Sequence, residues 1–179
     1  MRLDQNEGDP WDSMDENEDF SGILVGEHEG TVVFLIRGKG TQLNSHLLKQ
    51  YLLECLEQNK TLFQIDLTSC TYMDSTFLGT LAGLSSKVRA RASTLIQILN
   101  PTDRIMVMLE NLGIESLFQI TRQTVQPGNM LELEAGQVSK EAKSQEMLEA
   151  HEKLSEISPA NAAKFRDIVT LLRKRGNRP

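Results

Sequence analysis

An apolar strand that runs through a short polar turn into a helix constrains this chain more than any other part of its sequence. The strand has its apolar residues at Leu62, Phe63, Ile65 and Leu67. After the turn, apolar residues recur with helical spacing at Phe77, Leu81, Leu84 and Val88. Ser75 therefore falls at or beside the N-cap of the helix, where its oxygen can accept a bond from a free backbone N–H. The same helix end would stabilise an added phosphate.

The residues at this junction resemble the signature of the STAS family, the domain named for sulfate transporters and anti-sigma-factor antagonists. The matching residues are Asp66-Leu67 at the strand end and Asp74-Ser75-Thr76-Phe77-Leu78-Gly79 after the turn. The resemblance continues in order from about Ile23 to Ile120. Two positions depart from the family pattern: Phe77 stands where the family has glycine, and Gly38 is followed by Lys39-Gly40-Thr41 without the usual acidic residue.

The resemblance implies that a partner serine kinase phosphorylates Ser75, with Thr76 as the fallback site. It also implies a partner-binding surface formed by Asp74, Ser75, Thr76, Leu78 and Gly79. The partners would be a serine kinase that acts as an anti-sigma factor and a phosphatase. An added phosphate would carry a charge of about −1.5 to −2 next to Asp74 and would weaken docking.

The elements around the junction predict an α/β fold. Strands are expected at 23–25, 31–37, 62–67, 95–99 and 117–120, and helices at 44–58, 77–91 and 101–112. In this reading Asn44 and Asn100 are N-caps, Pro101 begins the third helix and Gly113 ends it. Because strands and helices alternate with short connections, we expect a mixed, mostly parallel, STAS-like sheet with helices packed against it.

Two further helices are predicted beyond this domain, at 139–157 and 159–175, and would form a C-terminal helical hairpin. Ser158-Pro159 is a restart signal, since serine suits an N-cap and proline the first helical position. One apolar stripe contains Met147, His151 and Leu154, and the other contains Phe165, Ile168, Val169 and Leu172. These stripes could pack on each other, on the sheet domain, on a second copy in a homodimer, or on a partner protein.

The distribution of charge separates the tail from the remaining chain. Residues 1–22 hold eight acidic residues and one arginine, whereas residues 23–130 hold nine acidic and nine basic ones. A disordered acidic tail at 1–22 is expected, followed by a STAS domain at 23–122, a linker at 123–138 and the hairpin at 139–175. Nucleic acid is not expected as a partner because the sequence has no basic, aromatic-interleaved face. Membrane insertion is not expected either, and the predicted location is the cytoplasm.

The sequence offers little for catalysis, metal binding or a cofactor. A seryl nucleophile needs a nearby base, and no motif connects His28, His46 or His151 with Ser75, so all three are expected at the surface. Cys55 and Cys70 are expected to be buried or half-buried free thiols. No enzyme activity, metal or cofactor is therefore predicted. The expected function is that of a bacterial signalling protein resembling an anti-sigma-factor antagonist, and the alternative is a constitutive STAS subunit of a transport or signalling complex.

Overall fold

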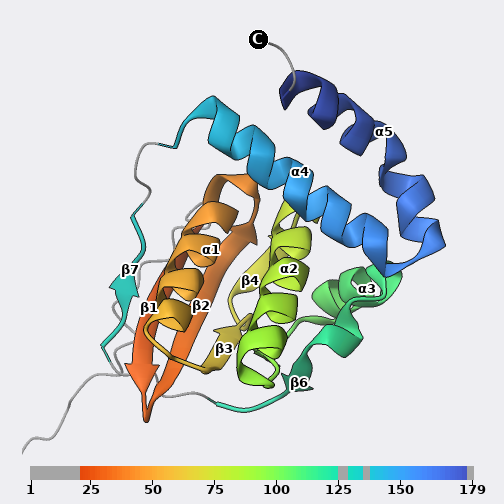
Figure 1. Cartoon of the computed structure of the whole chain (residues 1–179). Helices are drawn as coiled ribbons and strands as arrows, with labels where there is room; N and C mark the ends of the chain where they lie inside the picture. Colours follow the sequence, from red (N-terminus) through yellow and green to blue (C-terminus); the bar gives the residue numbers. More distant parts are fainter. Residues whose placement is uncertain (1–20, 125–128, 135–137, 177–179) are drawn as a thin grey trace, which may run out of the picture.

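The computed structural model describes residues 21–124, 129–134 and 138–176, and its centre is a mixed sheet with helices packed against it (Figure 1). The strands are β1 (Gly22–His28), β2 (Thr31–Gly40), β3 (Leu62–Asp66), β4 (Cys70–Met73), β5 (Gln97–Leu99), β6 (Gln119–Thr121) and β7 (Leu131–Glu132). The helices are α1 (Gln42–Glu57), α2 (Ser75–Ala92), α3 (Asp103–Leu112), α4 (Lys140–Ile157) and α5 (Pro159–Gly176), with a short 3-10 turn at Glu115–Leu117.

The strand order is β6-β5-β3-β2-β1-β7, and β4 pairs with the far end of β2. Strands β2, β3, β5 and β6 run parallel, while β1 is antiparallel to both β2 and β7. This arrangement confirms the expected mixed, mostly parallel sheet. The parallel pairing brings the carboxyl ends of β2 and β4 to the edge where α1 and α2 begin.

The core lies between the sheet and its helices. The apolar run of β2 is buried along its whole length, with Phe34 and Ile36 fully buried, and Phe63 and Ile65 lie beside it in β3. The helical apolar spacing of α2 directs Phe77, Leu81 and Val88 into the same core. Burial on both faces explains why β2 reads as a continuous apolar run and not as an alternating one.

Three local predictions were wrong in detail. The turn before Asp74 contains the strand β4, which pairs in parallel with Gly38–Gly40 of β2. Helix α1 begins earlier than expected: Thr41 is its N-cap, and Asn44 instead closes the capping box by accepting a bond from the Thr41 N–H.

Helix α3 likewise begins after Thr102, not after Asn100. Asn100 adopts a positive φ of 52° and spends its side chain on holding Gln123 through two hydrogen bonds. The Asn100-Pro101 pair correctly predicted a helix start in this region, but Asn100 bonds Gln123 and Thr102 is the N-cap of α3.

The C-terminal helices form the predicted hairpin. Ser139 caps α4, and the Ser158 hydroxyl accepts a bond from the Asn161 N–H at the start of α5. Helix α4 runs across α1 and α2 on the side away from the sheet, and α5 lies along the outer side of α4 (Figure 1). The apolar stripes thus pack on each other and, through Leu154, on the sheet domain.

The predicted tail and linker flank the sheet domain. The predicted tail lies outside the described residues except for Ser21 and Gly22, and Gly22 already begins β1. The described part of the predicted linker includes β7, which pairs with Leu24 and Val25 of β1.

Candidate functional site

The candidate site lies at the start of α2, where Asp74 holds two helices together. One Asp74 carboxylate oxygen accepts a bond from the Phe77 N–H at 2.8 Å, which makes Asp74 the N-cap of α2. The other accepts a bond from the Gln42 N–H at 2.9 Å, at the first residue of α1. One carboxylate therefore accepts bonds from free N–H donors of both helices, and its negative charge interacts favourably with the positive ends of both helix dipoles.

Ser75 is the first residue of α2 and lies next to a histidine from α4. Its Oγ is 3.0 Å from Nε2 of His151. The other ring nitrogen, Nδ1, is 2.8 Å from the Met147 carbonyl oxygen, which can only accept, so Nδ1 carries a proton. In the tautomer with its proton on Nδ1, Nε2 accepts a hydrogen bond from the Ser75 hydroxyl.

The Ser75 contact corrects the expectation that the histidines lie at the surface. His28 is exposed as expected, but His151 is 5 % exposed and His46 is 9 % exposed. His151 joins Ser75 across 76 residues of sequence, and its ring also packs edge-on against Phe165 of α5. No local motif could have found this pair. The position of His151 in an apolar helical stripe was the one signal for burial, and the surface expectation did not follow it.

The Ser75–His151 pair has the separation of a nucleophile and its base, but its surroundings differ from those of a catalytic dyad. A backbone carbonyl, not a carboxylate, orients the ring, and Phe165 packs against it. A cavity of about 300 Å³ opens nearby between α2 and α4, and neither Ser75 nor His151 is among its lining residues. The pair connects α2 to α4.

Three of the five predicted partner-binding residues are buried. Thr76 and Leu78 are 4 % and 2 % exposed, and only Asp74 and Ser75 remain half-buried. Gly79 lies directly under α4: a Cβ atom at this position would stand 2.3 Å from the Ala150 carbonyl oxygen. The missing side chain lets the two helix backbones touch, so α4 covers part of the predicted surface.

The two departures from the family pattern lie against each other. The Phe77 ring is fully buried and packs on Gly40, where a Cβ atom would come within 2.9 Å of the ring. The glycine missing at position 77 is thus matched by the glycine at position 40, which makes room for the larger side chain.

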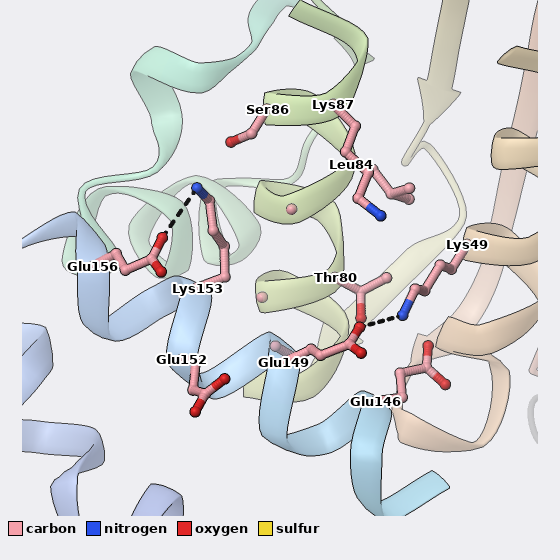
Figure 2. Close-up of a pocket in the computed structure, with 13 residues that line it drawn as sticks. Lys49, Thr80, Leu84, Ser86, Lys87, Glu146, Glu149, Glu152, Lys153 and Glu156 are labelled. Atoms are coloured by element: carbon pink, nitrogen blue, oxygen red, sulfur yellow. Dashed lines mark hydrogen bonds and ion pairs between the residues drawn. The ribbon is translucent and has the colours of Figure 1, made fainter. Parts of the chain in front are cut away.

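Polar contacts hold the other side of α4 to α1. Lys49 forms an ion pair with Glu149 at 2.6 Å, and the Ser45 hydroxyl is 3.4 Å from a Glu146 carboxylate oxygen. Burial raises the pKa of Glu146, and the Lys49 charge offsets part of this effect. Figure 2 shows Lys49, Glu146 and Glu149 at the cavity, whose lining combines three lysines with four glutamates.

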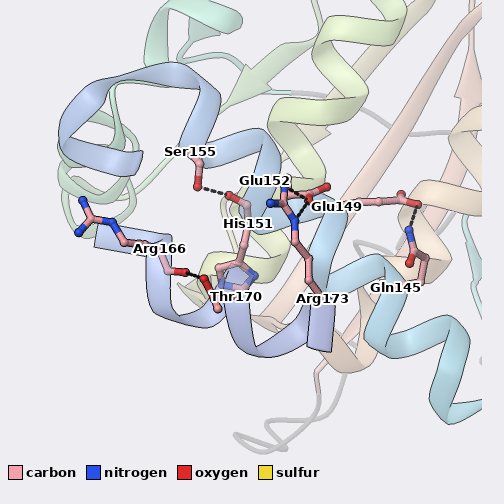
Figure 3. A network of polar contacts seen from close by, with 8 residues as sticks. All are labelled: Gln145, Glu149, His151, Glu152, Ser155, Arg166, Thr170 and Arg173. Atoms are coloured by element: carbon pink, nitrogen blue, oxygen red, sulfur yellow. Dashed lines mark hydrogen bonds and ion pairs between the residues drawn. The ribbon is translucent and has the colours of Figure 1, made fainter. Parts of the chain in front are cut away.

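Helix α5 is fixed to α4 and to the end of α3. Arg173 donates from Nε and a terminal nitrogen to one Glu152 oxygen, at 2.8 and 2.7 Å (Figure 3). Asn161, which is 3 % exposed, donates to the carbonyl oxygens of Leu112 and Leu154. These contacts align the hairpin over the sheet domain.

Within the described ranges, no group of three or more histidine, cysteine or acidic side chains could hold a metal ion. None of the helices there is long and apolar enough to span a membrane. Cys55 and Cys70 are both buried and unpaired, as expected, and burial raises the pKa of each thiol.

Comparison with known proteins agrees with the fold. The family model of the STAS domain matches residues 23–127, more than half of the chain. A crystal structure from Thermotoga maritima, described as a candidate anti-sigma factor antagonist, superposes with a TM-score of 0.51 at 15% identity, covering 56% of this chain and 86% of that one.

Two structures of the Bacillus anti-sigma factor antagonist SpoIIAA, unphosphorylated and phosphorylated, both give TM-scores of 0.49 at 16% identity. They cover 57% of this chain and 89% and 91% of their own. A comparison with curated protein sequences finds no significant match. At these identities the superpositions bear on the fold alone.

Proposed function

Because the chain belongs to the STAS family, we propose that it is a bacterial signalling protein of the anti-sigma-factor-antagonist type, regulated by phosphorylation of Ser75. In the unphosphorylated form it would bind a serine kinase that acts as an anti-sigma factor, and phosphorylation would release it. A phosphatase would restore the binding form. Catalysis is no part of this proposal.

The observation that carries the proposal is the position of Ser75 at the first turn of α2. The first N–H groups of a helix have no acceptor within it, and together with the helix dipole they stabilise a phosphate. Between the two candidate acceptors, Ser75 is half-buried whereas Thr76 is 4 % exposed. Ser75 is therefore the more accessible hydroxyl.

The buried, unpaired thiols Cys55 and Cys70 support a reducing compartment, so the proposal includes a cytoplasmic location. Homodimerisation through the hairpin remains an expectation that mass measurement can test.

Phosphosite mapping of the protein isolated from the cells that make it tests the proposal. We expect phosphate on Ser75 and its complete loss in the Ser75→Ala variant. Phosphate mapped only to Thr76 or Ser69, or undiminished labelling of Ser75→Ala, would reject the assignment. Ser75→Asp should weaken partner binding only in part, because a carboxylate carries less charge than a phosphate.

One observation favours the alternative, a constitutive structural subunit. The Ser75 hydroxyl already has a role in the fold, through its contact with His151. In that case Ser75→Ala would lower the stability of the hairpin, and no phosphate would be found on Ser75 in any growth condition.

A further inference from the structure

The surface around Ser75 is occupied by the chain itself. Helix α4 crosses α1 and α2 over the start of α2 (Figure 1). Ala150 touches Gly79, and His151, one residue later, contacts Ser75. We propose that the α4–α5 hairpin is an intramolecular cover that competes with the partner for this surface and must open before Ser75 can be phosphorylated. This inference rests on the proposed function for its biological role, but the opening itself does not.

The packing of α4 on α2 shows why the cover excludes a partner. Gly79 is buried where the backbones of α2 and α4 meet, so a protein could contact it only after α4 has moved. At Gly79 the two backbones already meet, which leaves no room for another chain between them.

The Ser75–His151 contact connects phosphorylation to the closure. The Ser75 oxygen that would receive the phosphate lies 3.0 Å from Nε2 of His151, and once it carries a phosphoryl group it has no hydroxyl proton left for this bond. By linkage, a modification that only the open form accepts shifts the population toward that form. Phosphorylation would therefore also hold the cover open.

The contacts between the hairpin and α1 fit a reversible cover. The Lys49–Glu149 ion pair has partly exposed side chains, and such pairs contribute little to stability. Glu146 faces Ser45 through a long bond of 3.4 Å. A partner must still displace a tethered segment, whose effective concentration is on the order of millimolar.

Thiol labelling of a Ser75→Cys variant measures this opening without any kinase. Position 75 is half-buried against His151 in the closed form, so a small thiol reagent should react faster with the new cysteine in the open form, and the labelling rate rises with the open population. Cys55 and Cys70 are buried in the sheet domain and serve as internal reporters, because their reaction would reveal global unfolding.

Two substitutions in the full chain provide a matched pair on α2. In Gly79→Ala the added Cβ would meet the Ala150 carbonyl at 2.3 Å and push α4 away, whereas in Gly83→Ala the nearest atom is Lys153 Cγ at 4.0 Å. We expect Gly79→Ala to raise the labelling rate at position 75 by about tenfold, which corresponds to about 1.4 kcal/mol. Gly83→Ala should leave the rate unchanged.

A second pair lies on α5 and leaves α2 unaltered. Leu172 is 3 % exposed and Leu171 is 46 % exposed, so Leu172→Ala should loosen the hairpin and speed labelling while Leu171→Ala should not. Equal rates in all four variants, or labelling of Ser75→Cys as fast as in the denatured chain, would overturn the cover.

Mapping of phosphate on Ser75 in cells that carry Leu172→Ala or Leu171→Ala, with the native serine, separates this proposal from the proposed function. More phosphate in Leu172→Ala supports both. Accelerated labelling with no phosphate on Ser75 in any variant supports the cover and rejects the phosphorylation switch. Accelerated labelling with equal phosphate in both variants would overturn the claim that opening limits phosphorylation.

Discussion

The sheet domain and the C-terminal hairpin are held in place by different kinds of contact. The sheet domain surrounds large apolar side chains such as Phe34, Phe63 and Phe77, each 1 % exposed or less. The hairpin joins this core through Leu154, Phe165 and Val169, and next to Ser75 it adds the close backbone approach at Gly79 and the Ser75–His151 contact. The comparison contrasts a scaffold of fully buried rings with a segment that also depends on polar and backbone contacts at the candidate site.

The largest expected effect comes from Phe77 in the sheet domain. Phe77→Ala should lower the free energy of unfolding by about 3–5 kcal/mol, because a fully buried ring is lost and a cavity remains beside Gly40. Urea unfolding measures the change. A loss below about 1 kcal/mol would mean that the ring does not belong to the scaffold.

In the hairpin, Phe165→Ala should have a smaller effect and lower the free energy of unfolding by about 3 kcal/mol, the low end for this substitution. Phe165 is 7 % exposed and packs on His151 at the edge of the core. Amide hydrogen exchange measures the loss of protection in α4–α5 and in β2 and β3, and the comparison shows which of the two regions is destabilised. Equal loss in both regions would show that the hairpin and the scaffold unfold as one unit.

At the junction of the two helices, Asp74→Ala should cost about 1–2 kcal/mol because both α2 and α1 lose a bond to the carboxylate. Asp74→Asn keeps an oxygen acceptor and is the matched control, so it should cost less. Thermal unfolding of both variants measures the difference. An Asp74→Ala midpoint equal to that of the wild type would show that Asp74 does not stabilise the starts of α1 and α2.

The smallest effect concerns pH and the buried His46. Burial, with the Lys143 charge as a second cause, lowers the pKa of His46 from its ordinary 6.5. The unfolded chain therefore takes up the proton more readily, so stability is full above about pH 6.5 and falls as the pH drops through the lowered pKa.

His46→Gln should therefore lose less stability than wild type between about pH 7.5 and about pH 5.5. His28→Gln, at an exposed position, is the control. Glu146, whose pKa is raised, contributes with the opposite sign, so the difference between the variants is the quantity to measure. If the stability of His46→Gln changes with pH as steeply as that of the wild type, the His46 ring does not set the pH dependence.

The sequence alone determined the scaffold, because its signals are local and strong. The apolar run in β2 and the change from strand to helical spacing around Asp74 predicted the elements, the sheet type and the position of Ser75 at a helix start. Ser158-Pro159 likewise predicted the break between α4 and α5. Such patterns depend on neighbours within a few residues. Tertiary contacts moved the ends of two helices, at Thr41 and Thr102, and formed the strands β4 and β7, which the sequence did not predict.

Only the tertiary structure decided what lies against the candidate site. The proximity of His151 to Ser75, of Ala150 to Gly79 and of Phe77 to Gly40 joins residues that are 37 to 76 positions apart. Helical spacing predicts that an apolar stripe must be covered. It does not predict which segment covers the stripe, because any apolar partner buries a similar apolar surface area. That choice depends on shape: the absence of a side chain at Gly79 admits the α4 backbone, and this close approach brings His151 to Ser75.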